Sequence, residues 1–311
     1  MTTAEHENHT TYLATKNPHP RDRHIHFDEG PHKYTIEGIE GIPPETEFTS
    51  VTTWVHQHFE HFDAKKVIAG MMRNQKKWND PISNAKYYGK TSEEIEEMWE
   101  KSGQDAAMAG TEMHYKIECF YNNPSTNDHH PDHPSKELEY FMNFHRDFSK
   151  ILRPYRTEWT VFHEEARIAG SIDMVYELTT EPLAPSSLQS PEVPGPGVEV
   201  EDVVSLPRGT SLVIYDWKRC REIIKTNRAN KYATHPIIEH LPDTNYWHYA
   251  LQLNIYKYIL EAKYDKTITD LYIIVLHPDA QNYQRIKLPN LQTEVAELFE
   301  ERIKKHKEEK Q

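Results

Sequence analysis

The 311-residue chain has 37% hydrophobic and 11% aromatic residues, which suits one large α/β domain or two small ones and excludes a peptide or a disulfide-stapled miniprotein. Its 36 Lys and Arg against 49 Asp and Glu give a net charge of -13, which argues against passive coating of nucleic acid but not against an enzyme with local basic strips. No run approaches the roughly 18 to 20 apolar residues that cross a bilayer, and no apolar signal block opens the chain, so we expect a soluble intracellular protein without membrane contact.

The N-terminal third divides into an arm and a helical region. Residues 1–24 are polar, His-rich and without periodicity, which predicts a mobile arm. Residues 32–36 and 47–52 have strand-like composition on either side of a Gly/Pro turn, which predicts a strand pair. Residues 53–121 have the pattern of helices. We therefore expect an N-terminal hairpin and basic helical extension over 25–104.

Two basic strips interrupt the acidic background. Residues 64–90 contain seven Lys and Arg against Asp80 alone, together with Trp78 and two tyrosines, and cations among aromatic rings suit stacked bases and phosphates. Residues 215–232 contain six Lys and Arg against two acids. For either strip the alternative is an ordinary solvated face. From the two strips we predict nucleic-acid contacts at Lys76, Lys77, Trp78, Arg219, Arg221 and Lys231.

The remainder, 105–311, is predicted to be an α/β core. Apolar spacing favours helices over 135–150, 244–263 and 291–308. Strands are expected over 155–163, 167–178, 211–218 and 271–276. Between the second and third of these strands, prolines prevent a ladder over about 180–209, which predicts an extended surface insertion. Helices alternating with strands predict a mixed central sheet flanked by helices.

Asp216 and Lys218 end an apolar strand. Because alternate side chains share a face, Leu212, Ile214, Asp216 and Lys218 should point one way and Val213, Tyr215 and Trp217 the other. A buried carboxylate and amine cost several kcal/mol unless each has a partner, and a divalent cation suits the carboxylate. The acid-x-Lys spacing alone is common, since Asp63 and Lys65 also satisfy it on a predicted helix surface.

Three other segments supply polar groups in order along the chain. Asp173 lies in a strand three residues after Gly170, which allows close backbone approach. A hairpin would bring Asp173 beside Asp216, and His114 on a helix would add an imidazole, which makes a site suited to Mg²⁺ or, better, Mn²⁺. Gln252 and Tyr256 share a helix face and can bind a phosphate or the lysine.

The ordered set of motifs resembles the PD-(D/E)XK nuclease superfamily, in the branch of RecB nuclease domains and lambda-type exonucleases. The match covers about 105–280, and a basic helical segment before the core resembles the helical gates of some single-strand exonucleases. The chain departs from relatives in its long proline-rich insertion and in having only two cysteines, without the quartet of the iron–sulfur members. The motifs are Gly110 with His114, Gly170-Ser-Ile-Asp173, Asp216-Trp-Lys218 and Gln252 with Tyr256.

The resemblance implies a metal centre. Asp173 and Asp216 would be its central ligands, and the backbone carbonyl of Trp217 and the imidazole of His114 would complete it. Glu158 occupies the preceding strand, where relatives often keep an acidic residue, and would be an extra ligand or a supporting group. The cofactor would be Mg²⁺ or Mn²⁺, which can activate water and neutralise phosphate charge.

The resemblance also implies roles in phosphodiester cleavage. Lys218 would orient and help to deprotonate the attacking water, and Gln252 and Tyr256 would hold the phosphate backbone or position Lys218. The activity would be a metal-dependent deoxyribonuclease, an exonuclease acting on DNA ends or single-stranded DNA, with the strip at 64–90 guiding the strand.

Other interpretations remain at this point. An endonuclease for junctions or flaps, a nuclease for RNA, and a scaffold that has lost catalysis all share these motifs, whereas no Gly-x-x-x-x-Gly-Lys-Ser/Thr loop supports an ATPase. Taken singly, each candidate has an ordinary structural interpretation, such as a helix histidine or a strand-end acid, and Glu118 and Arg156 are ambiguous. We interpret two histidine clusters as solvated: His129, His130 and His133, and His56, His58 and His61.

Overall fold

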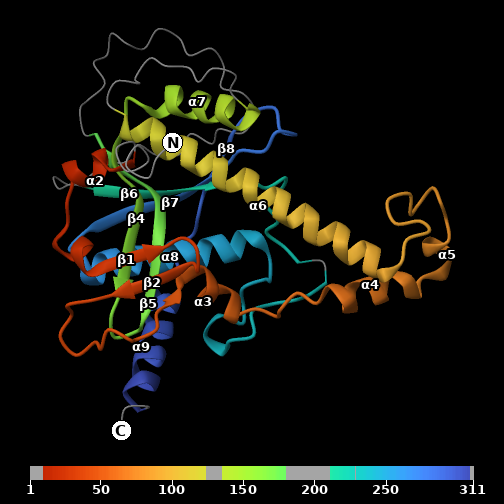
Figure 1. The fold of residues 1–311 in the computed structure, drawn as a ribbon, viewed down its shortest axis with the longest axis horizontal. Coiled ribbons are helices and arrows are strands. Elements are labelled where there is room, and N and C mark those ends of the chain that lie inside the picture. The colour runs from red at the N-terminus through yellow and green to blue at the C-terminus, as the bar shows by residue number, and fades with distance from the viewer. Residues whose placement is uncertain (1–9, 124–134, 180–210, 228, 309–311) are drawn as a thin grey trace.

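A mixed α/β fold with a mixed sheet flanked by helices appears in the computed structural model (Figure 1), as the sequence predicted. The structure describes residues 10–123, 135–179, 211–227 and 229–308. In the larger sheet the strands run in the order β4, β5, β6, β7, β8, and β3 also pairs with β5. Only the β3–β5 and β6–β7 pairs are parallel. The bounds are β3 Thr49–Ser50, β4 Leu152–His163, β5 Ile168–Leu178, β6 Ser211–Lys218, β7 Thr267–Val275 and β8 Gln284–Lys287.

Two apolar clusters sandwich the sheet. One joins α3, α8 and α9 to the face that carries Leu212 and Ile214, and the other joins α6 and α7 to the face that carries Val213, Tyr215 and Trp217. The alternation predicted for β6 is therefore confirmed, and it follows from the two-residue period of a strand. The helices are α3 Val51–Gln57, α6 Ser92–Asn122, α7 Lys136–Phe148, α8 Asn245–Lys263 and α9 Gln292–Glu308.

The N-terminal segment is packed against the sheet rather than mobile. Residues 10–24 form the short helix α2 Tyr12–Lys16 and the 3₁₀ turn η1 Pro20–His24. Leu13 is buried, and its N–H donates to Asn122 Oδ1 at 2.9 Å. Asp22 accepts from Arg156 and from the Trp159 indole. The prediction of a mobile arm is wrong for 10–24, since a few anchors without periodicity hold it, and residues 1–9 lie outside the described residues.

The predicted pairing of 32–36 with 47–52 is also wrong. β2 Lys33–Ile36 pairs with the preceding β1 Ile25–Asp28. Residues 49 and 50 instead pair with β5 of the main sheet. The strand ends there because the Ser50 side chain accepts from the Thr53 N–H and caps α3.

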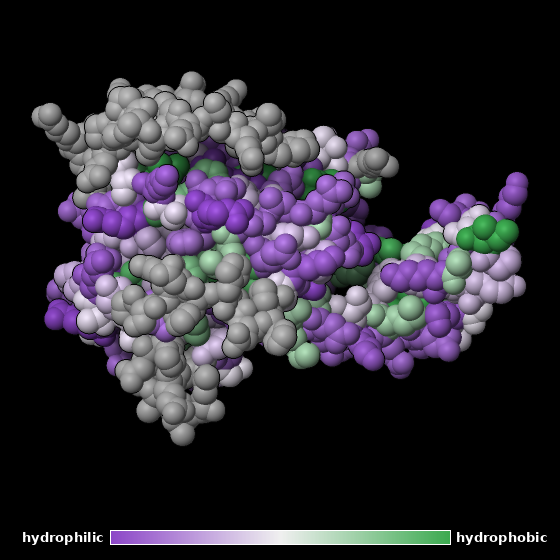
Figure 2. Space-filling view, turned by 90° about the horizontal axis from the view of Figure 1, so that it is seen from above, coloured by the Kyte–Doolittle hydropathy of each residue, from purple (hydrophilic) through white to green (hydrophobic). Residues whose placement is uncertain are grey.

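A second segment, residues 64–91 with the start of α6, projects from the core on one side and is called the arm from here on (Figure 1). The helices predicted over 53–121 are four, because Asp63 caps α4 Ala64–Arg73, Asn74 caps α5 Gln75–Trp78, and a loop precedes α6. α6 has 31 residues, so it runs about 46 Å from the arm into the core. From above, Figure 2 shows a hollow between the arm and the body of the molecule.

The other boundaries follow the predictions to within a few residues. The exceptions are β4 and β7, which begin three and four residues earlier than expected, and β8, whose four residues were not predicted. The proline-rich insertion at 180–209 and the cluster at 129–133 lie outside the described residues. Within the described ranges, no helix is long and apolar enough to span a membrane. His58, interpreted as solvated, is buried between Trp54 and His235, and burial lowers its pKa to about 4.

Candidate functional site

The candidate site lies where two strands share one edge of β5. β4 pairs with β5 along its whole length, so β3 and β6 must both lie on the opposite edge. β3 pairs at Ile168 and Ala169, and β6 pairs only from Met174 onward. Residues 170–173 therefore have an edge that neither strand covers. Backbone and side-chain groups that the ladder leaves free converge at this gap.

Asp173, His114 and the backbone of Trp217 meet at the gap. Trp217 lies beyond the last β5–β6 pair, so its N–H donates to Asp173 Oδ2 at 2.9 Å instead of to the ladder. His114 Nε2 lies 2.9 Å from the Trp217 carbonyl oxygen. With the proton on Nε2, the other ring nitrogen carries a lone pair that faces Asp173 Oδ2 at 3.5 Å. The predicted meeting of these three residues is thus observed.

Glu158 completes this cluster from β4. By register it lies opposite Asp173, because Thr157 pairs with Met174 and Trp159 with Ile172. Its φ of 40° is in the left-handed region in mid-strand, where a non-glycine residue costs about 1–3 kcal/mol. One carboxylate oxygen accepts from Ser171 Oγ at 2.8 Å, and the other lies 3.9 Å from His114 Nδ1. Two acids opposite each other on neighbouring strands repel, so this geometry is costly without a cation.

Asp216 and Lys218 form a buried pair beside the cluster. Lys218 Nζ lies 2.5 Å from Asp216 Oδ2, and the two side chains are 17% and 3% exposed. Among the described residues, Oδ2 of Asp216 nonetheless has no hydrogen bond of good geometry. The ammonium also lies over the Tyr249 ring, 4.7 Å from its centroid, a distance at which cation–π attraction applies.

Helix α8 packs one of its faces against the site. Tyr249, Gln252 and Tyr256 follow one another at three- and four-residue spacing, so they point the same way. The Gln252 side chain is a hydrogen-bonding neighbour of the Tyr256 hydroxyl. A Cβ added to Gly170 would lie 2.8 Å from both the Cε1 and the hydroxyl of Tyr256. Gly170 is therefore required for Tyr256 to reach the gap, and this is the close approach that its position predicted.

The pKa values of the cluster reflect burial and crowded charge. Burial opposes the charge of His114, but Asp173 and Glu158 outweigh it and raise its pKa to about 9. Burial and then the Asp173 charge raise the pKa of Asp216 to about 6. Burial alone would lower the pKa of Lys218, but Asp216 and Asp173 raise it above its ordinary value. A raised pKa favours the ammonium form of Lys218, which can donate hydrogen bonds.

The cluster has the ligand atoms and the spacing to hold a metal ion. Ligand atoms of His114, Glu158 and Asp173 all lie within 4.8 Å of one another. One imidazole and two carboxylates, with a backbone carbonyl adjacent, are donors that such ions accept. Asp216, predicted as a central ligand, lies outside this group and is turned toward Lys218. Its incompletely bonded oxygen and its proximity to Asp173 leave it beside the same site.

A second acidic group does not have these properties. His163, Glu164 and Glu165 are also close enough to share an ion. Glu164, however, accepts from Arg21 at 2.6 Å, and Glu165 lies 2.6 Å from Lys263. Resident side-chain cations already balance these acids, so we interpret the group as an ion-pair network that joins the N-terminal segment to the core.

Three site residues were not predicted. Tyr34, on β2, neighbours the Ser171 backbone and Glu158, and burial followed by the Glu158 charge raises its pKa. Glu118, one helical turn after His114, was left ambiguous; it is half-buried, and burial and Glu158 raise its pKa to about 8. Tyr249 was the third. Glu118 and Tyr249 could have been found from their helical spacing to His114 and Gln252. Tyr34 could not, because nothing in the sequence joins β2 to this gap.

The predicted nucleic-acid residues fall into two groups. Lys76 and Lys77 are exposed on α5, beside the half-buried Trp78. The other three cations lie on the core, and each pairs with a carboxylate: Arg219 with Glu137, Arg221 with Asp279 and Lys231 with Glu60. The exposed pairs are weak in water, so they do not prevent Arg221 and Lys231 from binding phosphate. Arg219, in a more buried pair, is the least available.

Comparison with known proteins adds no family. No protein-family model matches the chain. No curated protein matches it either.

Proposed function

We propose that this chain is a divalent-metal-dependent nuclease with a PD-(D/E)XK core that hydrolyses phosphodiester bonds in DNA. The observation that carries the proposal is the meeting of His114, Glu158, Asp173, Asp216 and Lys218 from four elements, α6, β4, β5 and β6. Five ionisable groups at one partly buried place are costly unless they serve a ligand or a reaction. A phosphodiester with a bound cation is the ligand that this set of charges suits.

The residues divide the work as follows. His114, Glu158 and Asp173 would hold Mg²⁺ or Mn²⁺, with the Trp217 carbonyl adjacent and Asp216 alongside. A bound divalent ion supplies charge neutralisation at the phosphate and a more acidic water. Lys218 donates hydrogen bonds to the attacking water or to a phosphate oxygen, and Asp216 with the Tyr249 ring keeps its ammonium in place. Gln252 and Tyr256 brace the underside of the gap.

The substrate we propose is a DNA end or a single strand, which makes the enzyme an exonuclease. The support is the arm, which carries the cations and aromatic residues of the 64–90 strip away from an acidic body. A cleavage assay tests both parts: end-labelled linear DNA, single- and double-stranded, is incubated with the protein in Mg²⁺, Mn²⁺ or EDTA. We expect metal-dependent loss of linear substrate. If a circular single strand is cut as fast as a linear one, the enzyme is an endonuclease. If RNA is cut faster than DNA, the substrate is RNA rather than DNA.

The variants Lys218→Met and Asp173→Asn test the site itself. Each removes a charge that contacts the reacting centre, so we expect a loss of at least about 100-fold in cleavage rate. Lys305→Met on α9 is the matched control, because the same change at an exposed helix lysine should leave the rate unchanged. Thermal unfolding of each variant distinguishes loss of function from loss of fold. Parental rates in both site variants, with intact folds, would refute the proposal.

A further inference from the structure

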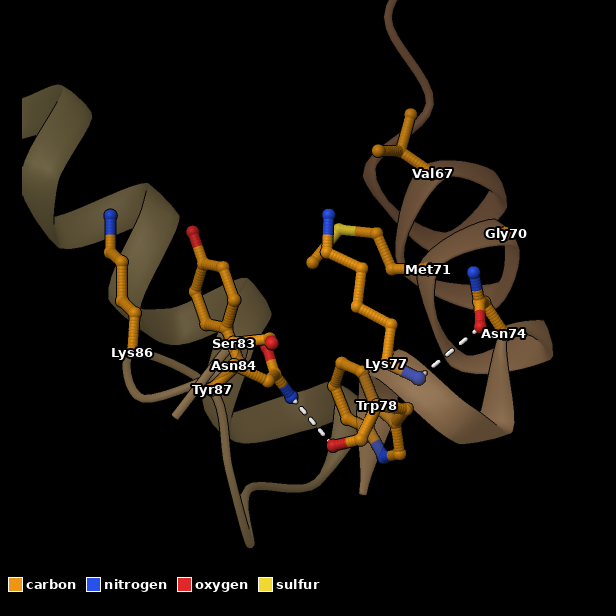
Figure 3. Close-up of a pocket in the computed structure, with 10 residues that line it drawn as sticks. All are labelled: Val67, Gly70, Met71, Asn74, Lys77, Trp78, Ser83, Asn84, Lys86 and Tyr87. Carbon is orange, nitrogen blue, oxygen red and sulfur yellow. Dashed lines mark hydrogen bonds between the residues drawn. The ribbon is translucent and has the colours of Figure 1, made fainter. Parts of the chain in front are cut away.

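The arm contains a cavity of its own, remote from the candidate active site. It has a volume of about 550 Å³ and lies between α4, α5 and the loop that leads to α6. This is within the range of roughly 300–1,000 Å³ that small-molecule sites occupy. Figure 3 shows Tyr87 and Lys86 facing Lys77 and Met71 across the cavity, with the Trp78 indole at its base. The amines of both lysines and the Tyr87 hydroxyl lie on the same side of it.

Two hydrogen bonds hold the Tyr87 side chain and the Trp78 backbone at the sides of the cavity. Trp99, on α6, donates its indole N–H to the Tyr87 hydroxyl at 2.9 Å. Asn84 Nδ2 donates to the Trp78 carbonyl at 2.9 Å and so joins the loop to α5. The Tyr87 ring, held in this way, loses little side-chain entropy when another ring stacks on it. The cavity is thus formed before any ligand enters.

The charge of the cavity is positive and uncompensated. The one acid of the strip, Asp80, accepts from the Ile82 N–H and from the Ser83 hydroxyl, so it serves to shape the loop. Within the described residues neither Lys77 nor Lys86 forms an ion pair with a carboxylate. Both are exposed at the surface. The Lys86 ammonium lies over the Tyr87 ring, 5.2 Å from its centroid. Two ammonium groups that no carboxylate neutralises, beside two aromatic rings, are a combination that phosphate and a nucleobase satisfy together.

We propose that this cavity receives an unstacked nucleobase of single-stranded nucleic acid, with Lys77 and Lys86 on the adjacent phosphates. The inference deepens the proposed function, and it rests on that function for the link to cleavage but not for binding. A duplex keeps its bases stacked inside, so it cannot fill the cavity without unpairing. The arm is therefore a sensor for single strands rather than a general basic surface.

The distance along α6 sets a length requirement for the substrate. Trp99 braces the cavity and His114 belongs to the candidate active site, and His114 follows Trp99 by 15 positions on one helix, which corresponds to about 22 Å. A strand that rises about 3.4 Å per stacked nucleotide needs about six nucleotides to reach both places. Shorter strands would be cleaved without help from the arm.

Binding in EDTA tests the inference without cleavage. The probe is a fluorescent oligothymidylate of about 15 nucleotides, measured by anisotropy at several salt concentrations. Trp78→Ala should weaken binding by about 5- to 150-fold, as the loss of one stacked base does. Trp78→Phe should retain most of the affinity, which excludes collapse of the arm as the cause. Lys305→Gln, on α9, should change nothing.

Neighbouring lysines separate the cavity from a diffuse positive strip. Lys76 and Lys77 are adjacent, exposed and equal in charge, but only Lys77 lines the cavity. Lys77→Gln should reduce the salt slope by about 0.7, the value of one phosphate contact, and Lys76→Gln should reduce it by less. Equal losses for both, with no loss for Trp78→Ala, would overturn the inference. The inference would also be overturned if free thymidine monophosphate displaced the fluorescent probe as effectively as an unlabelled oligothymidylate does. The cavity would then be a site for a mononucleotide.

The outcomes also separate this inference from the proposed function. Binding with the expected variant pattern but no cleavage under any metal would leave the cavity assigned and the nuclease refuted. Cleavage that Trp78→Ala leaves unchanged on strands both shorter and longer than about six nucleotides, together with unchanged binding, would refute the cavity alone. Support for both requires that Trp78→Ala slows cleavage only of the longer strands.

Discussion

Two glycines of the candidate site should respond to alanine in opposite directions. Gly170 is on β5 at the uncovered edge, and Gly110 is on α6 one turn before His114. A Cβ at Gly170 would lie 2.8 Å from two atoms of the Tyr256 ring and hydroxyl and 3.0 Å from Val51 Cγ2. A Cβ at Gly110 would meet no atom within 4 Å, and its φ is not positive.

The magnitudes follow from these contacts. Tyr256 is 3% exposed within the α8 cluster and Val51 is fully buried, so neither can withdraw from a new methyl group without disturbing the core. Overpacking of this kind costs about 1–3 kcal/mol. At Gly110 the same substitution removes the helix penalty of glycine and should stabilise by about 0.5–1 kcal/mol. The free energies of unfolding of the two variants should therefore differ by about 1.5–4 kcal/mol, although both carry the same chemical change.

Urea denaturation followed by tryptophan fluorescence measures both variants. We expect Gly170→Ala to lower the midpoint and Gly110→Ala to raise it, with unchanged slopes. Adding Tyr256→Phe to Gly170→Ala removes the hydroxyl contact but leaves the Cε1 contact, so it should restore only part of the lost stability. If Gly170→Ala is as stable as the parent, the close approach of Tyr256 to β5 is not as described, and the position of α8 under the site would be wrong.

Two further predictions concern charge. The pKa of His114 is raised to about 9 and that of Asp216 to about 6. Both groups must lose a proton before they serve a cation, so the affinity for Mn²⁺ should rise between about pH 6 and about pH 9. Calorimetry in buffers of different ionisation enthalpy would detect the released proton, and a pH-independent affinity would contradict it. In the N-terminal segment, Asp22→Ala leaves the buried Arg156 without its carboxylate and should lower the free energy of unfolding by about 3 kcal/mol. A decrease of only a few tenths of a kcal/mol, measured by urea denaturation, would mean that the segment is loosely held.

Much of the fold and of the site was predictable because short-range periods determine which side chains share a face. The two-residue period of β6 correctly assigned Asp216 and Lys218 to the face of α8, where Lys218 lies over Tyr249, and Trp217 to the other face. The helical period of α8 did the same for Gln252 and Tyr256. These patterns are local, so no knowledge of the tertiary structure was needed.

Other features depend on where elements meet. The uncovered edge of β5 exists because β3 stops at Ser50 and β6 pairs with β5 no further than Tyr215, and neither limit is a property of a single segment. The approach of Tyr34 depends on the small β1–β2 sheet, whose pairing partner was predicted incorrectly. The N-terminal segment was mistaken for a mobile arm because its anchors, Leu13 and Asp22, are too few to form a period.

The net charge of the site explains why a proton and a metal ion would compete there. Glu158, Asp173 and Asp216 bring three negative charges, and Lys218 returns one positive charge. With neutral His114 the site is therefore doubly negative, which one divalent cation balances. Without a cation, His114 takes up a proton between Asp173 and Glu158, which is the physical meaning of its raised pKa. Binding of a metal ion should therefore displace the proton from His114. A cluster that only stabilises the fold would bind no metal ion, and no proton would be released when the ion is added.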